Sequence, residues 1–457
     1  MFKLDITADQ LVSALLRLAS NETVCILDSC GVRHLGSHLL IAGIEPVETI
    51  EITNDDPAQT LRVLDEKLTS DLAATFTISY DFGRKLIGHG KPPFSISNEP
   101  DVFIAQFDTL IFHDYDSGIT HISGNEVKFD AIRLKLELAI SNITSEISIK
   151  PPTVTSNFNK SEYFAAIENI KELIRNGDTY QTNLTQQLTA TLGVDLTPEI
   201  VFERLRRDHP APFSAFIKRL DSTVISASPE RFFKTSCDVS QSQFISTSPI
   251  KGTRPRGKTT LEDAALKQDL LTSEKDLAEN TMIVDLLRND LGRVCEYGSV
   301  YVEKLCEIEE HPTLFHLVST VSGVLLEKTK PSDILNALFP CGSITGAPKI
   351  NTMRIIDEIE TAPRGLSMGA IGVYIPGSKF KVQSSDEDRD SEIHHSPLTN
   401  QHSFMDLSVA IRTMVIRDKT ATFNVGGGII IDSDPESEYE ETLTKAKALL
   451  DAIGGKL

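Results

Sequence analysis

Short runs of apolar or alternating residues, each bounded by turn residues, recur along the whole chain and constrain its fold more than any other feature. In the first third they lie at residues 24–27, 39–44, 74–78 and 102–107. They return at residues 179–184, 213–217, 224–228, 232–234, 370–375, 407–416 and 422–425. Runs of this length between turn residues are typical of β-strands. The chain is therefore predicted to build extensive sheets.

A smaller number of segments repeat apolar residues at helical spacing. One helix is predicted near residues 61–68, and a second after Ser161, which can cap it, with Gly177 beyond its end. A long helix is predicted over residues 274–292, opened by Ser273. Two more are expected, one starting at Pro348 and one over residues 434–453. Periodicity alone therefore predicts an α+β protein.

The Pro-Pro-Thr break at residues 151–153 is the best candidate for a domain boundary. It separates an N-terminal region, residues 1–150, from a second region, residues 155–455. The chain has 457 residues, 40% of them hydrophobic, which is enough to bury a large core. Residues 381–403 are dense in Ser, Asp, Glu and His and have almost nothing to bury. We expect them to form a disordered surface insertion.

Charge and cysteine content limit the classes of partner. There are 45 Lys and Arg against 65 Asp and Glu, a net charge of -20, which argues against nucleic acid and anionic membranes as partners. The six cysteines show none of the spacings of zinc ligands, so reduced thiols and a cytoplasmic location are expected. We predict neither a secretory segment nor a membrane-spanning helix.

Lys251 stands in an unusual context for a lysine. Pro249 and Ile250 precede it, and Gly252 follows, so the backbone there can approach another group closely. This pattern predicts an amine that points into a pocket. An amine in a partly apolar pocket loses some of its proton and becomes a nucleophile. From this motif alone, a turn lysine in an ordinary loop is the preferred interpretation.

Two predicted helices place pairs of carboxylates on one face. Glu438 and Glu441 are three residues apart, with Lys445 four residues further on, and Asp276 and Glu279 are also three apart. Such pairs suit a hard divalent cation, but from spacing alone solvated, salt-bridged faces are the preferred interpretation. The glycine run at residues 426–428 follows a predicted strand. Its bare N–H groups could hold an anion, and a flexible turn is the alternative.

Seven groups of residues occur in the order in which a known enzyme family carries them. They are residues 177–184, 228–232, 249–253, 278–290, 316–320 and 342–349, and the pair at 441–442. On these motifs, residues 161–450 resemble the chorismate-binding enzymes, and most closely the aminodeoxychorismate synthase components I. The resemblance implies two packed, largely antiparallel sheets flanked by helices, an α/β/β/α-like arrangement in which N- and C-terminal parts form one body.

Two positions discriminate within that family. Isochorismate and salicylate synthases carry a water-activating lysine where this chain has Gln181, so the resemblance implies ammonia as the nucleophile. Anthranilate synthases carry alanine where this chain has Lys251. The aminodeoxychorismate enzymes carry lysine there, which is thought to add to C2 of chorismate before ammonia enters at C4. Anthranilate synthase component I and a non-catalytic chorismate-binding subunit remain the alternatives.

The resemblance also implies roles for individual residues of the site. It gives Glu279 and Glu441 as Mg²⁺ ligands, with Asp276 and Glu438 in supporting positions. Glu230 matches the general acid for the departing C4 hydroxyl, and His316 matches a histidine near the ring. The substrate-binding positions that match are Gln181, Thr345, Arg412, Lys445 and the N–H groups of Gly426 and Gly428.

The expected activity is Mg²⁺-dependent amination of chorismate with ammonia to 4-amino-4-deoxychorismate, for p-aminobenzoate and folate synthesis. Ammonia is mostly protonated near neutral pH, so delivery from glutamine by a glutaminase is an advantage. None of the six cysteines lies in the Gly-x-Cys-x-Gly elbow of a triad amidotransferase. A separate glutamine amidotransferase subunit is therefore predicted as partner.

Overall fold

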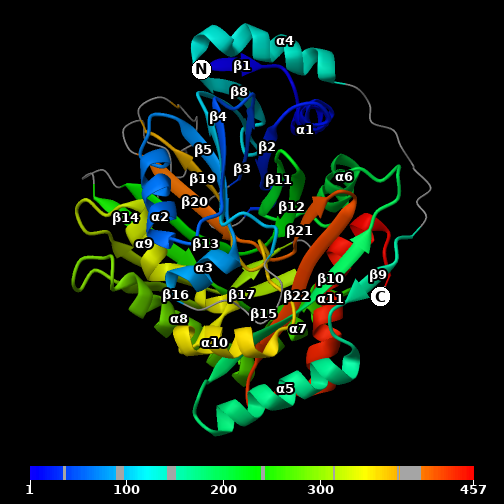
Figure 1. The fold of residues 1–457 in the computed structure, drawn as a ribbon, viewed down its shortest axis with the longest axis vertical. Helices are drawn as coiled ribbons and strands as arrows, with labels where there is room; N and C mark the ends of the chain where they lie inside the picture. The colour runs from blue at the N-terminus through cyan, green and yellow to red at the C-terminus, as the bar shows by residue number, and fades with distance from the viewer. Residues whose placement is uncertain are drawn as a thin grey trace.

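Two large sheets run through the middle of the molecule (Figure 1). The computed structural model describes residues 1–33, 38–88, 97–140, 151–237, 242–311, 314–377, 380 and 403–456. The predicted insertion at residues 381–403 lies outside the described residues, apart from Ser403. Every strand pair assigned within the two sheets is antiparallel, as expected from the resemblance.

The first sheet has twelve strands. In spatial order they are β1 (Phe2–Leu4), β8 (Ile119–Gly124), β7 (Thr109–Asp114), β3 (Leu39–Ile44), β2 (Val24–Asp28), β11 (Phe213–Lys218), β12 (Ser222–Ser228), β21 (Thr413–Arg417), β22 (Thr420–Ile429), β10 (Gln181–Thr191) and β18 (Gly346–Ala347), with β9 (Val154–Ser156) also on β10.

The second sheet has ten strands. Their order is β15 (Ile250–Pro255), β17 (Leu314–Val324), β14 (Gln243–Ser248), β13 (Arg231–Cys237), β20 (Phe404–Val409), β19 (Ala370–Ile375), β5 (Ala73–Ile78), β6 (Val102–Phe107) and β4 (Glu48–Ile52), with β16 (Tyr301–Glu310) also on β17.

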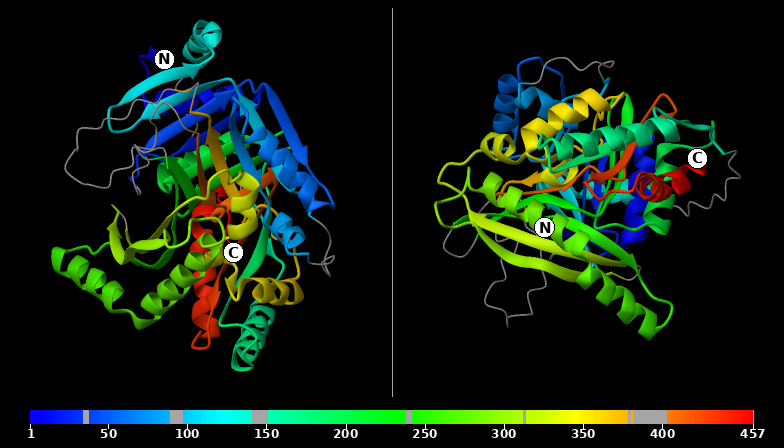
Figure 2. Two further views of the ribbon diagram at one scale, coloured as in Figure 1. Left: turned by 90° about the vertical axis from the view of Figure 1, so that its left-hand side faces the viewer. Right: turned by 90° about the horizontal axis from the view of Figure 1, so that it is seen from below.

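Helices cover the outer faces of both sheets (Figures 1 and 2). The first sheet packs against α1 (Ala8–Ala19), α4 (Phe129–Ala139), α6 (Pro198–Asp208) and α11 (Pro435–Ile453). The second packs against α2 (Pro57–Lys67), α3 (Tyr80–Leu86), α8 (Glu274–Leu291), α9 (Pro331–Leu338) and α10 (Lys349–Ile359). The remaining helices are α5 (Lys160–Arg175), α7 (Thr260–Thr272) and the short 3-10 turns Glu126–Lys128 and η2 (Gly342–Ile344).

A third core lies between the two sheets. Phe112 and Ile217 of the first sheet pack in one buried cluster with Phe103 and Ile371 of the second. Burial of aromatic and branched side chains on both inner faces joins the sheets into one body. The layer order is therefore helix, sheet, sheet, helix, which confirms the predicted fold class.

Strands from the N-terminal region are built into both sheets. In the first sheet, β2 pairs with β11, and in the second, β5 pairs with β19. N- and C-terminal parts of the chain therefore share each sheet, as the resemblance implied. The boundary near residue 150 stays a prediction. No helix among the described residues is long and apolar enough to cross a membrane.

Local signals were confirmed at two helix ends. Ser273 caps α8 by accepting from the Asp276 N–H, and Gly177 follows α5 with φ of +83°. The prediction of Ser161 as a cap was wrong, because the Asn159 side chain accepts from the Glu162 N–H in a capping box. Residues 407–416 were also wrong as one strand. The predicted strand is interrupted before Arg412, whose φ is +49°, so that two strands, β20 and β21, form instead.

Candidate functional site

Lys251 lies on the edge strand β15, not in a turn, and its side chain is 13% exposed. Its Nζ is 3.9 Å from Glu279 Oε2 on α8 and 3.5 Å from the carbonyl oxygen of Ser343. The strand lies against α8 because Gly252, with φ of +86°, has no Cβ: one would be 3.0 Å from Asp276. The glycine after the lysine therefore brings its amine toward the carboxylates.

Glu230 lies between β12 and β13 and is 5% exposed. Burial raises the pKa of its carboxyl, while a hydrogen bond from Ser343 and the charge of Lys251 oppose the rise. Its Oε1 is buried without a hydrogen-bond partner among the described residues. A buried carboxyl that favours its protonated form and has a free oxygen can act as a general acid.

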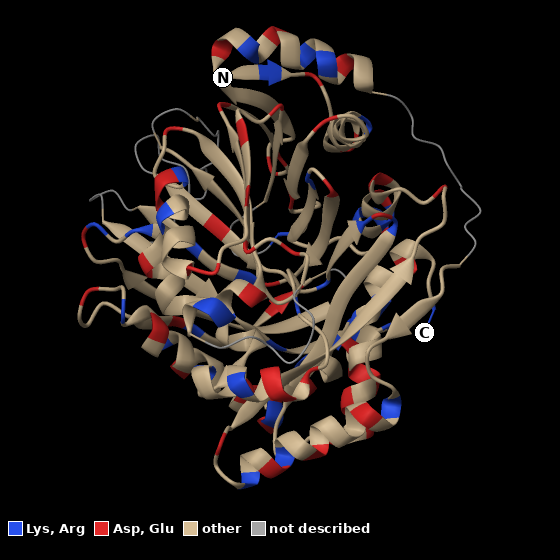
Figure 3. Ribbon diagram, in the orientation of Figure 1, with Lys and Arg blue, Asp and Glu red and all other residues tan. Residues whose placement is uncertain are grey.

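The carboxylates of α8 and α11 form a loosely connected group around Lys275. Lys275 Nζ is 3.3 Å from Glu438 Oε1. Burial lowers the pKa of Lys275, but the charges of Glu438, Glu279 and Glu441 outweigh this effect and raise it overall. On α11, Lys445 Nζ is 2.7 Å from Glu441 Oε1. The Glu441 side chain is 48% exposed, and although its partial desolvation favours protonation, this ammonium holds the pKa of Glu441 below its usual range. Acidic residues along α11 are visible in Figure 3.

The glycine run lies inside strand β22, which corrects its interpretation as a turn. It pairs with β10, and Asn183 is opposite Gly428. A Cβ on Gly428 would be 2.1 Å from Gln181 Nε2, and one on Gly427 would be 3.2 Å from Glu438 Oε2. Bare backbone therefore faces both the amide and the carboxylates. Both polar atoms of the Gln181 side chain are buried without a partner among the described residues.

The other predicted residues have different surroundings. His316 Nδ1 is 2.9 Å from Thr253 Oγ1, next to β15. The Thr345 hydroxyl donates to the Cys341 carbonyl at 3.0 Å, and its own carbonyl accepts from the Asn183 N–H. Burial lowers the pKa of Arg412, and no carboxylate pairs with its guanidinium in the described ranges. A half-buried, unpaired guanidinium of this kind suits a carboxylate ligand.

The donor set fits Mg²⁺, but the described part of the chain contains no preformed cage. No group of three or more His, Cys, Asp or Glu residues there is close enough to hold a metal ion. Mg²⁺ commonly binds one or two carboxylates and completes its shell with substrate oxygens and water. Glu279 and Glu441 carry such carboxylates, and Glu441 Oε1 would be 3.8 Å from a Cβ on Gly427, so both residues are chemically suitable ligands.

Two residues of this cluster were not predicted. Ser343 lies within the quoted motif at residues 342–349, but its bond to Glu230 depends on a tertiary contact. Lys275 precedes Glu279 by four residues, so helical spacing could have identified it as a partner of these carboxylates.

This arrangement and the fold define a class. Residues 22–382 and 398–451 match the model of the family described as chorismate binding enzyme, and the chain belongs to that family.

Individual relatives carry two different names. The chain is 34% identical over 388 residues to aminodeoxychorismate synthase component 1 of Bacillus subtilis, covering 82% of this chain and 76% of that protein. It is also 34% identical over 448 residues to an anthranilate synthase component 1 of Haloarcula marismortui, covering 90% and 82%. The solved anthranilate synthase component I of Streptococcus pneumoniae superposes with a TM-score of 0.73 at 28% identity, covering 92% of this chain and 93% of that one.

Proposed function

We propose that the chain is an aminodeoxychorismate synthase component I, which aminates chorismate at C4 in the cytoplasm. The single observation that supports this is Lys251, an amine held in the site between Glu230 and Glu279. Identity does not separate the two named classes, because relatives of both are 34% identical. Lysine at this position is the feature that resembles the aminodeoxychorismate enzymes.

In the proposed mechanism the Lys251 amine, as its free base, forms a bond to C2 of chorismate. Both double bonds of the conjugated ring shift by one position, and the C4 oxygen leaves as water with the proton of Glu230. Ammonia then bonds to C4, both double bonds shift back, Lys251 is released from C2 as the free amine, and the proton that ammonia loses returns to Glu230. Chorismate and ammonia thus give 4-amino-4-deoxychorismate and water, which supplies p-aminobenzoate and folate synthesis.

The remaining residues bind and orient the substrate. Arg412, Lys445 and the N–H groups of Gly426 and Gly428 would hold its carboxylates. Gln181, a neutral amide, can position ammonia but cannot activate water as a base. Thr345 and His316 would line the ring. Mg²⁺, when bound by Glu279 and Glu441 with Asp276 and Glu438 in support, would neutralise the ring carboxylate and draw charge from the ring.

The test is to incubate the purified chain with chorismate, Mg²⁺ and ammonium salt at elevated pH and to identify the product. We expect 4-amino-4-deoxychorismate without free pyruvate. Anthranilate with pyruvate would establish anthranilate synthase instead, the alternative that the second relative favours. No turnover would support a non-catalytic chorismate-binding subunit.

Ammonia is predicted to come from a separate glutamine amidotransferase subunit. The designation "component 1" of the Bacillus subtilis relative supports a partner of some kind. The purified chain is expected to use ammonium salt but not glutamine, and glutamine use should appear on addition of an amidotransferase subunit. Efficient use of glutamine by this chain alone would contradict the prediction.

Replacing Glu230 by glutamine is expected to lower kcat by about 10²- to 10⁴-fold, because the general acid is lost. The wild-type rate at saturating ammonia should fall as pH rises through the raised pKa of Glu230, since only the protonated form donates. Replacing Ser343 by alanine removes a bond that favours the carboxylate and should move this limb to higher pH. An alkaline limb that persists in Glu230→Gln would assign it to another group.

A further inference from the structure

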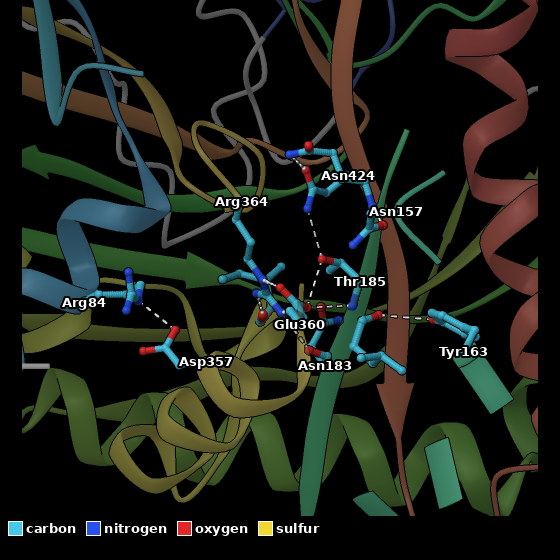
Figure 4. A network of polar contacts seen from close by, with 12 residues as sticks. Arg84, Asn157, Tyr163, Asn183, Thr185, Asp357, Glu360, Arg364 and Asn424 are labelled. Carbon is cyan, nitrogen blue, oxygen red and sulfur yellow. Dashed lines mark hydrogen bonds and ion pairs between the residues drawn. The ribbon is translucent and has the colours of Figure 1, made fainter. Parts of the chain in front are cut away.

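A buried ion pair lies between α10 and the strand that carries Gln181 (Figure 4). Glu360, which follows α10, is 4% exposed, and Arg364 is 3% exposed. Arg364 Nε is 3.0 Å from Glu360 Oε2 and its Nη2 is 2.8 Å from Glu360 Oε1. This two-point geometry fixes the guanidinium plane, and such pairs keep their orientation better than a lysine contact.

Both side chains of the pair also form hydrogen bonds with backbone groups close to residues of the candidate site. Arg364 donates to the carbonyl of Ile344 at 2.9 Å and to the carbonyl of Asn183 at 2.7 Å. Glu360 Oε1 accepts from the N–H of Thr185 at 2.7 Å and from its hydroxyl at 2.9 Å. The pair therefore joins the end of η2 to strand β10, although 150 residues or more separate them in the chain.

The two tethered points adjoin predicted substrate contacts. Ile344 precedes Thr345, whose carbonyl accepts from the Asn183 N–H at 2.8 Å. Asn183 follows Gln181 by two residues on β10, so both side chains lie on the same face of the strand. The fit is tight: a Cβ on Gly346 would be 2.0 Å from the Gln181 carbonyl oxygen. A change at the ion pair would therefore shift the backbone beside Gln181 and the backbone beside Thr345, and alter the spacing between these two residues.

A tyrosine of the N-terminal region packs against the Arg364 guanidinium. The Arg364 guanidinium lies 4.4 Å from the ring centroid of Tyr80, at the start of α3, and Tyr80 is fully buried. An aromatic face beside a desolvated guanidinium is a favourable contact that also restricts its position. The guanidinium is thus held on one side by Glu360 and on another by the ring.

We propose that Glu360 and Arg364 form a positioning pair that sets the distance between Gln181 and Thr345 in the chorismate pocket. Neither residue is proposed to touch substrate. The inference rests on the proposed function in one respect, which is that Gln181 and Thr345 line the chorismate pocket. Chorismate binding itself follows from the family. A second, partly buried ion pair offers a matched control: Arg84 Nε of α3 is 2.6 Å from Asp357 Oδ1 of α10.

The variants should be conservative, because deleting one partner leaves an unpaired buried charge and the chain could fail to fold. Arg364→Lys keeps the charge but cannot supply the planar set of donors. Glu360→Gln keeps the volume and can still accept from Thr185. The matched controls are Arg84→Lys and Asp357→Asn. Each protein is characterised by its Tm, by the Kd of chorismate with Mg²⁺ and no ammonia, and by kcat and KM for chorismate consumption.

We expect Arg364→Lys and Glu360→Gln to weaken chorismate binding and lower kcat by about 10- to 100-fold, the scale of a misplacement near 1 Å. The controls should lower Tm by a similar amount while their Kd and kcat stay within twofold of wild type. Equal effects in both sets, or unchanged Kd and kcat in the test set, would overturn the proposal.

Failure of the proposed function can be distinguished from failure of the positioning role of Glu360 and Arg364. If the wild type bound chorismate but consumed none with ammonia, the proposed function would fail, and the four Kd values would still decide the role of this pair. If Arg364→Lys did not fold, Glu360→Gln against Asp357→Asn would make the same comparison.

Discussion

Replacing Lys251 by alanine is expected to abolish most amination at C4, with a loss of about 100-fold or more in turnover, equivalent to about 2.7 kcal/mol of barrier. The variant keeps the carboxylates, Glu230 and the glycine strand, so chorismate should still bind. The amine that would bond to C2 is absent, and any residual product is expected to be diverted from the 4-amino isomer. Product identification and the rate together measure both effects.

The covalent step can be observed directly in the wild type. Chorismate added with Mg²⁺ in the absence of ammonia should leave a mass adduct on the peptide that contains Lys251, and the alanine variant should show none. Lys267→Ala is a suitable control, because that lysine lies on α7 and pairs with Glu310. An alanine variant at residue 251 with wild-type rate and product would refute the assigned role.

The second large effect is expected at Glu279 and Glu441. Replacing either by glutamine removes one negative charge with little change in volume, and should weaken Mg²⁺ binding and lower turnover by about 100-fold, since carboxylate oxygens are the ligands that this ion prefers. The measurements are the Mg²⁺ dependence of turnover and calorimetric titration of Mg²⁺ in the presence of chorismate.

Exposed neighbours on the same helices provide controls. Glu274 lies on α8 and Glu440 on α11, and both are exposed. Glu274→Gln and Glu440→Gln change the net charge by the same amount and should leave the Mg²⁺ dependence unchanged. If the Glu279 and Glu441 variants behaved like these controls, the two carboxylates would be structural only.

Much of the fold could be predicted from local pattern, because strand length and turn residues are local properties. The strand over residues 102–107 was predicted with the bounds of β6. The prediction failed where tertiary contacts decide the outcome. The glycine run is extended because β10 pairs with all three glycines, and the 407–416 run is broken because Arg412 adopts a positive φ.

The site divides in the same way. Carboxylates three apart on a helix can be identified from spacing, and the motif around Lys251 suggested an amine directed into a pocket. Contacts between distant segments could not be identified, because no local pattern encodes them. The bond from Ser343 to Glu230 and the contact of Arg364 with Asn183 each join segments more than 100 residues apart.

The sharing of both sheets by the two ends of the chain has a consequence for synthesis on the ribosome. Strand β5 pairs with β19, which is made about 290 residues later, a wait of roughly 15–60 s at 5–20 residues per second. Until then one edge of β5 has no native partner, and the nascent chain exposes hydrogen-bonding groups that can pair with other chains. We therefore expect the early strands to gain from protection during translation, until the late strands complete both sheets.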